Sequence, residues 1–164
     1  MCIRDRGLQA YGMKDLETAD KYMTWATQND QLQNVKKVIW RNLAKVRLAL
    51  KKYDRALVAS NNFLKDEDQP YRRADGMLDK ASILLGLGKY SDARKTAEEA
   101  LALGVEGPLM ASLKIVLGDI SYAEKKFDEA AKHYGVTAEL FVNDAELKPK
   151  ALFKAAEALD KAGR

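Results

Sequence analysis

Residues 40–56 read WRNLAKVRLALKKYDRA. This segment places the bulky Trp40 four residues before the small Ala44, and after a polar turn it continues with Tyr53 and Ala56. A residue without bulk lets two helices approach closely, and a later aromatic ring fills the gap at the start of the next helix. The segment therefore predicts two antiparallel helices joined by a short turn.

The same arrangement recurs at intervals of 37 residues. A leucine or an aromatic residue stands three positions before an alanine at Leu16, Tyr53, Tyr90 and Phe127. Nine positions before each of these, and once more near the end of the chain, the residue is small: Gly7, Ala44, Ala81, Gly118 and Ala155. Self-similarity at a fixed period of this length is the signature of a repeat array, so each repeat is expected to be one helical hairpin.

Turn and capping signals divide the array into units. Asp54, Asp92 and Asp128 stand where a carboxylate stabilises a helix N-terminus, and prolines precede or begin the next hairpins at residues 70, 108 and 149. The expected helices cover residues 2–13, 16–29, 33–50, 53–65, 71–86, 90–103, 108–124, 127–141 and 146–162. We interpret residues 1–164 as a single array with units at about 1–32, 33–69, 70–106, 107–144 and an incomplete 145–164.

The composition supports an all-α fold with a substantial core. The chain of 164 residues is 47% hydrophobic, contains only three prolines and is rich in helix-forming residue types. The single cysteine, Cys2, allows no intramolecular disulfide and no cysteine-based zinc site. The chain as given contains no apolar run that would span a membrane and no secretory signal among its first thirty residues, so its compartment, cytoplasmic or periplasmic, stays open.

The motif resembles that of the tetratricopeptide repeat family. The second unit carries it at Trp40, Leu43, Ala44, Tyr53, Ala56, Ser60 and Phe63, and the fourth at Leu117, Gly118, Phe127, Ala130 and Tyr134. The resemblance covers essentially the whole chain and implies a right-handed superhelical solenoid of about four and a half repeats. Two departures are the interval of 37 residues, where the usual unit has about 34, and Lys80 and Lys154, which stand where the motif favours leucine. We expect the third and fifth units to pack less well at these lysines.

The resemblance also implies a function. The family binds protein segments on the concave surface that the first helix of each hairpin lines, and sequences of this look are frequent in bacterial assembly proteins. The corresponding groove residues here are Arg41, Asn42, Lys45, Asp75, Asp79, Ser82, Asp119 and Tyr122. This set predicts a groove that is basic near the second unit and acidic beyond it, suited to a peptide or helix with opposite charges at its two ends.

One specificity within the family is disfavoured by the residues present. The members that bind a C-terminal carboxylate use lysine and asparagine on the first hairpins and a Lys/Arg pair on the third. Asn42 matches, but Leu8 replaces the first asparagine, and Asp75 and Asp79 stand in the places of the cations. A carboxylate would be repelled there.

The sequence offers little for catalysis or cofactors. The only histidine, His133, lies between Lys132 and Tyr134 on an expected helix, and no nucleophile with an oriented base can be assembled around it. Neither a phosphate-binding loop nor a set of metal ligands at suitable spacing is present. We therefore expect a binding scaffold without enzymatic activity, cofactor or metal.

A basic cluster supports the alternative function. From Lys36 to Arg55 the chain has eight basic residues and one acidic residue, although its net charge is only +4. Such a cluster favours nucleic-acid or anionic-surface binding if its charges form one contiguous face. The expected helix distributes them around its axis, which makes a protein partner the preferred interpretation.

Two features concern the ends of the chain. Residues 1–6 resemble a translated adaptor sequence, which would place the native N-terminus elsewhere. The last expected helix has no partner helix in the chain, and its apolar residues at 152, 153, 156 and 159 favour a longer array over a polar capping helix. This surface, together with Trp25, is also a candidate for homo-oligomer contacts.

Overall fold

The computed structural model describes residues 3–29 and 33–164 of the chain, and the described residues contain nine helices and no strands. The helices are α1 Ile3–Gly12, α2 Leu16–Thr27, α3 Gln33–Ala49, α4 Tyr53–Leu64, α5 Pro70–Gly86, α6 Tyr90–Ala102, α7 Gly107–Ala123, α8 Phe127–Leu140 and α9 Leu147–Lys161. Every helix end lies within two residues of the end predicted from the sequence. Cys2 and the predicted unit boundary at residue 32 lie outside the described residues.

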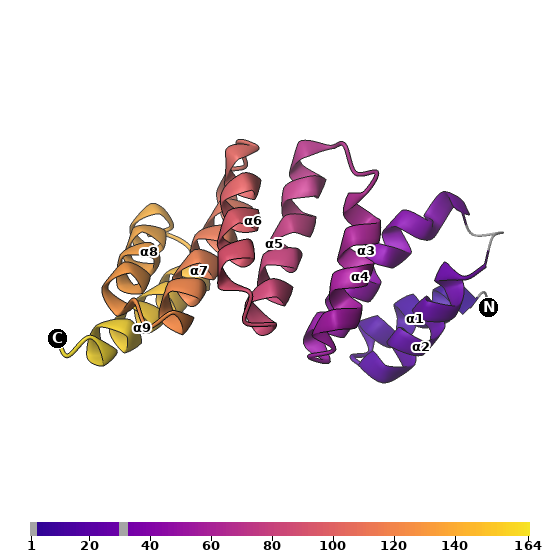
Figure 1. Cartoon of the computed structure of the whole chain (residues 1–164), viewed down its shortest axis with the longest axis horizontal. Helices are drawn as coiled ribbons and strands as arrows, with labels where there is room; N and C mark the ends of the chain where they lie inside the picture. The colour runs from indigo at the N-terminus through magenta and orange to yellow at the C-terminus, as the bar shows by residue number, and fades with distance from the viewer. Residues whose placement is uncertain (1–2, 30–32) are drawn as a thin grey trace.

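The helices form a row of antiparallel hairpins, α1–α2, α3–α4, α5–α6 and α7–α8, followed by α9 (Figure 1). Each helix packs on the next, so the array extends from the N-terminal to the C-terminal end of the molecule (Figure 1). The odd-numbered helices α3, α5, α7 and α9 also contact one another in succession, whereas within the described chain the even-numbered helices have no comparable mutual contacts. The odd-numbered helices therefore form the inner, concave side, and we call their shared surface the inner face.

The turn inside each hairpin has the same backbone conformation. One residue in it adopts positive φ, at Lys14, Lys51, Gly88 and Lys125, again 37 residues apart. In the second hairpin the amide of Lys51 donates to the carbonyl of Leu48 at 2.9 Å and that of Lys52 to the carbonyl of Arg47 at 2.8 Å. This pair of bonds is the Schellman arrangement, which pairs the last carbonyls of a helix and reverses the chain.

The small residues singled out in the sequence lie at helix crossings. Ala44, Ala81 and Gly118 are buried, and a Cβ added to Gly118 would lie 2.4 Å from Cε1 of Tyr134. Gly7 faces Met23, and Ala155 is partly buried beside the C-terminal core. The rings of Tyr53, Tyr90 and Phe127 begin α4, α6 and α8. Close backbone approach at each crossing lets a short helix pair bury a continuous core.

The structure adds two close contacts that the repeat motif does not contain. A Cβ added to Gly76 would lie 2.4 Å from the ring of Phe63, and one added to Gly86 would lie 2.3 Å from the ring of Tyr53. Both contacts join the second hairpin to the third. They show that the packing between units also depends on glycines outside the 37-residue series.

Candidate inner-face binding site

The charges predicted to line the groove bind to each other across α3 and α5. Arg41 of α3 forms an ion pair with Asp75 of α5. The ammonium of Lys45 lies 3.8 Å from the carboxylate of Asp75 and 3.7 Å from that of Asp79. The expected separation into a basic and an acidic part is therefore wrong for these four residues, because the two helices neutralise each other where they touch.

This network is not fully satisfied. Nε of Arg41 and Oδ2 of Asp79 are buried without a hydrogen-bond partner in the described structure. Burial raises the pKa of Asp79, and the opposing effect of Lys45 and Arg41 does not cancel it. A buried carboxylate without full hydrogen bonding costs stability in its charged form.

A second polar group joins α7, α8 and α9. The hydroxyl of Tyr134 donates to Asp119 at 2.6 Å, and the ammonium of Lys154 donates to the same carboxylate oxygen at 2.7 Å. Burial, and then the Asp119 carboxylate, raise the pKa of Tyr134 and keep the phenol protonated. These residues, together with Tyr122 and Glu157, line a cavity of about 270 Å³.

Lys154, which stands in a leucine position of the motif, is held by polar contacts. Its ammonium bonds to Asp119 and lies 5.5 Å from the centroid of the Tyr134 ring. A cation in this position is favoured both by the carboxylate and by the face of the ring. Lys154 thus joins α9 to the preceding hairpin.

The other predicted groove residues are less constrained. The hydroxyl of Ser82 donates to the carbonyl of Leu78 in its own helix. Asn42 is partly exposed and makes no side-chain hydrogen bond within the described residues. Of the eight predicted groove residues, the structure thus joins Arg41, Lys45, Asp75 and Asp79 in one network and places Asp119 and Tyr122 at one cavity.

Two exposed apolar residues on the inner face were not among the predicted groove residues. Val38 is 45% exposed and lies 37 residues before Asp75, so it occupies on α3 the position that Asp75 occupies on α5. Phe153 is 66% exposed and shares its register with Asn42 and Asp79. The 37-residue register would have placed both on this face. Exposed apolar side chains on a concave surface are the usual anchors for a bound segment.

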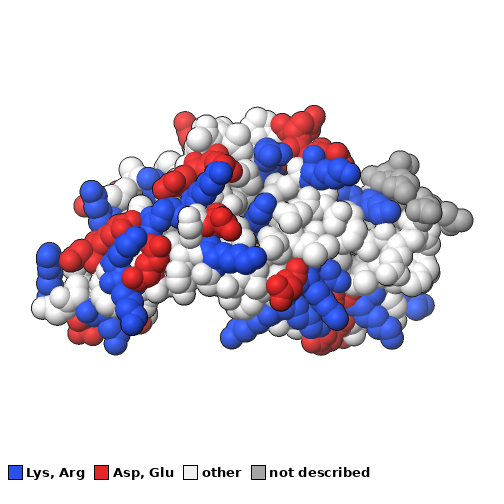
Figure 2. All heavy atoms as spheres, in the orientation of Figure 1, with Lys and Arg blue, Asp and Glu red and all other residues white. Residues whose placement is uncertain are grey.

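The basic cluster is largely paired. Of its eight cations, five form ion pairs, with partners on α2, the α4–α5 loop and α5: Lys37, Arg41, Lys45, Arg47 and Lys52. On the side of the molecule in Figure 2, basic and acidic groups lie next to each other along most of its length. A phosphate backbone needs a contiguous set of available cations, which this arrangement does not favour.

His133 lies in a polar group that resembles a catalytic triad only in composition. Oε1 of Glu129 lies 3.7 Å from Nε2 of His133 and accepts a hydrogen bond from the hydroxyl of Ser121 at 3.2 Å. Ser121 is fully buried, and the carboxylate stands between the hydroxyl and the imidazole. A nucleophilic serine requires the histidine next to its hydroxyl and access for a substrate. Burial is the main cause that lowers the pKa of His133.

The comparisons with known proteins agree with this architecture. A sequence model of the tetratricopeptide repeat family matches residues 78–140. This matched segment, residues 78–140, carries tetratricopeptide repeats. Among solved structures, the apo form of RapI superposes with a TM-score of 0.77 at 18% identity, over 98% of this chain and 48% of that protein. The chain thus spans about half the length of RapI.

MamA structures show the same fold. One matches with a TM-score of 0.68 at 16% identity over 98% of this chain and 87% of MamA. The MamA RS-1 ArsTM double mutant matches with a TM-score of 0.69 at 16% identity, over 97% of this chain and 89% of the other. No curated protein matches the sequence. The tetratricopeptide repeat is in general a protein-interaction scaffold. Among the described residues of this protein, no helix has the length and apolarity needed to cross a membrane.

Proposed function

We propose that the protein is a non-catalytic scaffold that binds a peptide or helical segment of a partner protein along its inner face. The observation that carries the proposal is the distribution of side chains on that face. Exposed Val38 on α3 and Phe153 on α9 stand toward its two ends, and the charges of α3 and α5 between them are paired. Apolar anchors with a neutralised polar surface between them suit an amphipathic segment better than a strongly charged one.

Polar groups near the two apolar anchors would orient the bound partner segment. Asn42 offers an amide that has no partner among the described residues, and the cavity lined by Asp119 and Tyr122 offers a carboxylate and a phenol. A partner amide or hydroxyl could bond to these groups without breaking the ion pairs between the hairpins. Binding in this form needs no change in the array, so a preformed surface would keep the cost of association low.

The test is affinity capture from a cell lysate treated with nuclease. The parent chain is compared with a Val38→Ala/Phe153→Ala variant and with the control Val58→Ala, whose 55% exposed side chain lies on α4. We expect the parent and the control to capture the same protein and the inner-face variant to lose it. Loss of two anchors of this kind should weaken binding by roughly 2 kcal/mol or more.

Two other results would argue against binding along the inner face. Equal capture by all three proteins would place the binding surface elsewhere on the molecule. A protein that the parent captures from an untreated lysate but not from the nuclease-treated one would support the basic cluster as the binding site, because nuclease removes its ligand.

A further inference from the structure

The even-numbered helices leave a cleft between successive hairpins on the outer side, and ion pairs cross two of these three clefts. Between α2 and α4, Nε of Arg47 donates to Asp20 at 2.8 Å, and the ammonium of Lys52 donates to the other oxygen of Asp20 at 3.0 Å. A second Arg47 nitrogen donates to the carbonyl of Arg55 on α4 at 3.2 Å. Burial alone would raise the pKa of Asp20, but the bonds from Arg47 and Lys52 hold it below its ordinary value.

The cleft between α6 and α8 is joined in the opposite sense. In the first cleft the earlier hairpin supplies the acid, Asp20. Here the earlier hairpin supplies the cation, Arg94, which stands 74 residues after Asp20 in the same register. Its guanidinium donates to Glu124 at 2.7 Å and to Glu129 at 2.9 Å. Charged groups therefore connect the hairpins on both sides of the middle cleft.

The middle cleft, between α4 and α6, lacks these groups. The positions of Asp20 and Arg47 are occupied by Leu57 and Leu84, so its floor is apolar. Lys89 stands in the register of Lys52 and Lys126, which both form ion pairs, but within the described structure Lys89 forms none. The cleft has a volume of about 360 Å³.

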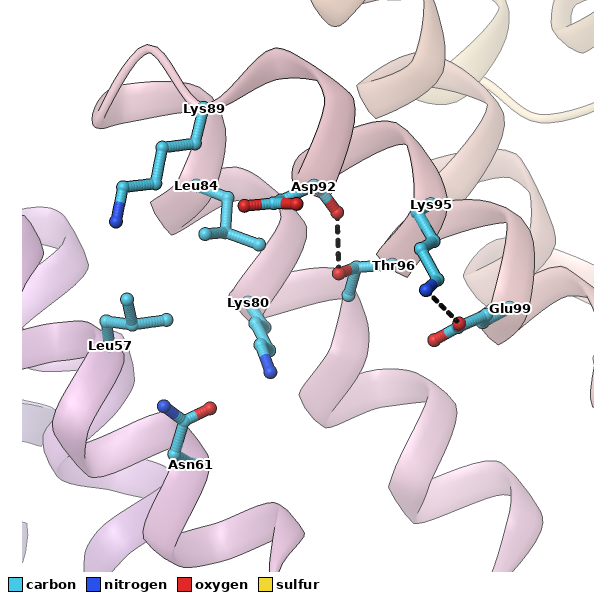
Figure 3. Close-up of a pocket in the computed structure, with 9 residues that line it drawn as sticks. All are labelled: Leu57, Asn61, Lys80, Leu84, Lys89, Asp92, Lys95, Thr96 and Glu99. Carbon is cyan, nitrogen blue, oxygen red and sulfur yellow. Dashed lines mark hydrogen bonds and ion pairs between the residues drawn. The ribbon is translucent and has the colours of Figure 1, made fainter.

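Lys80 supplies a second available cation. It stands where the repeat motif favours leucine, as at the buried Leu43 and Leu117 of the second and fourth units. Figure 3 shows its side chain extending from α5 into the space between α4 and α6, and it forms no ion pair with any described residue. The acidic residues of the rim are Asp92 and Glu99, and Glu99 is 4.0 Å from Lys95. Two ammonium groups and one carboxylate thus remain available around an apolar floor.

We propose that this outer cleft is a second docking site, for a partner segment that carries an acidic side chain beside an aliphatic one. The carboxylate would lie between Lys80 and Lys89, and the aliphatic group would pack on Leu57 and Leu84. Charge complementarity decides the class of partner, because the unpaired groups are mainly cationic and the adjacent clefts neutralise their own charges. The site is separate from the inner face and does not depend on binding there.

The probe for this site is a displayed library of random short peptides, selected against the full chain and then measured as synthetic fluorescent peptides. The informative variant is Lys80→Leu, which restores the residue that the motif prefers and should therefore preserve the fold. Lys132→Leu, which removes an exposed lysine of a separate pocket lined by α7 and α8, is the control. A second variant, Leu57→Asp/Leu84→Arg, copies the Asp20 and Arg47 pair and should close the floor.

We expect selected peptides to contain aspartate or glutamate next to an aliphatic residue. Their affinity should fall about tenfold or more in Lys80→Leu and in the double variant, and stay unchanged in Lys132→Leu. The proposal is wrong if the selection yields no acidic and aliphatic combination, or if the selected peptides bind Lys80→Leu as tightly as the parent.

Discussion

Replacing Gly118 by alanine tests the packing on which the array depends. The added methyl group would lie 2.4 Å from Cε1 and 2.7 Å from Cδ1 of Tyr134, far inside van der Waals contact. Tyr134 is 2% exposed and its hydroxyl bonds to Asp119 at 2.6 Å, so the ring has little room to move. Alanine in place of Gly118 must therefore displace the ring, the helix crossing or both.

The magnitude follows from three contributions. Overpacking a filled core costs roughly 1–3 kcal/mol. Weakening the hydrogen bond from Tyr134 to the Asp119 carboxylate costs about 1.5 kcal/mol. The better helix propensity of alanine offsets about 1 kcal/mol of these costs. We expect Gly118→Ala to lower the free energy of unfolding by about 2 kcal/mol, measured by urea denaturation followed by circular dichroism.

A matched control separates packing from propensity. Gly135 lies in α8 and a Cβ added there would meet nothing within 4 Å. Gly135→Ala should therefore raise stability by roughly 0.5–1 kcal/mol. If Gly118→Ala were as stable as the parent while Gly135→Ala gained stability, the close crossing of α7 and α8 would be refuted.

Three further predictions concern backbone strain and buried carboxylates. Lys51 has a φ of 55°, so Lys51→Gly should raise stability by about 1 kcal/mol in urea denaturation, and a lower unfolding midpoint would contradict the turn geometry. The pKa of Asp20 is lowered in the folded state, so the carboxylate stabilises the fold at pH values above its ordinary pKa of 3.8, and this stabilisation is lost as the pH falls through the folded-state pKa. Asp20→Asn should therefore have a lower melting temperature than the parent at pH 7, and the difference should disappear in acid. Asp79 has a raised pKa, which makes its charged form destabilising at neutral pH and its protonation stabilising as the pH falls through the folded value. Asp79→Asn should therefore melt higher than the parent at pH 7 and lose this advantage at low pH, and a lower melting temperature at pH 7 would show that its ion pair with Lys45 dominates.

The helices could be predicted from the sequence because each signal is local. A small residue, a turn and an aromatic residue at fixed spacing occur within one hairpin, and together they place each helix end within two residues of its observed position. The left-handed turn residues could also have been found, since Gly88 occupies the same register as three lysines.

The site could be predicted only in part, because its properties depend on contacts between units. The resemblance to the repeat family predicts Arg41, Lys45, Asp75 and Asp79 as groove residues of neighbouring helices. Their pairing depends on how closely α3 and α5 approach, which is a property of the packed array. The sequence alone does not reveal the partner of Lys154, because Asp119 lies 35 residues away, on α7.

The most direct test of the scaffold proposal is photocrosslinking from defined positions. Benzoylphenylalanine is introduced separately at Phe153 on the inner face, at Lys80 in the outer cleft and at Val58 on α4, and each protein is irradiated in lysate. If the inner face holds a partner segment, position 153 will give a discrete crosslinked protein that position 58 does not. Crosslinks of equal yield from position 58, or none from position 153, would contradict binding along the inner face.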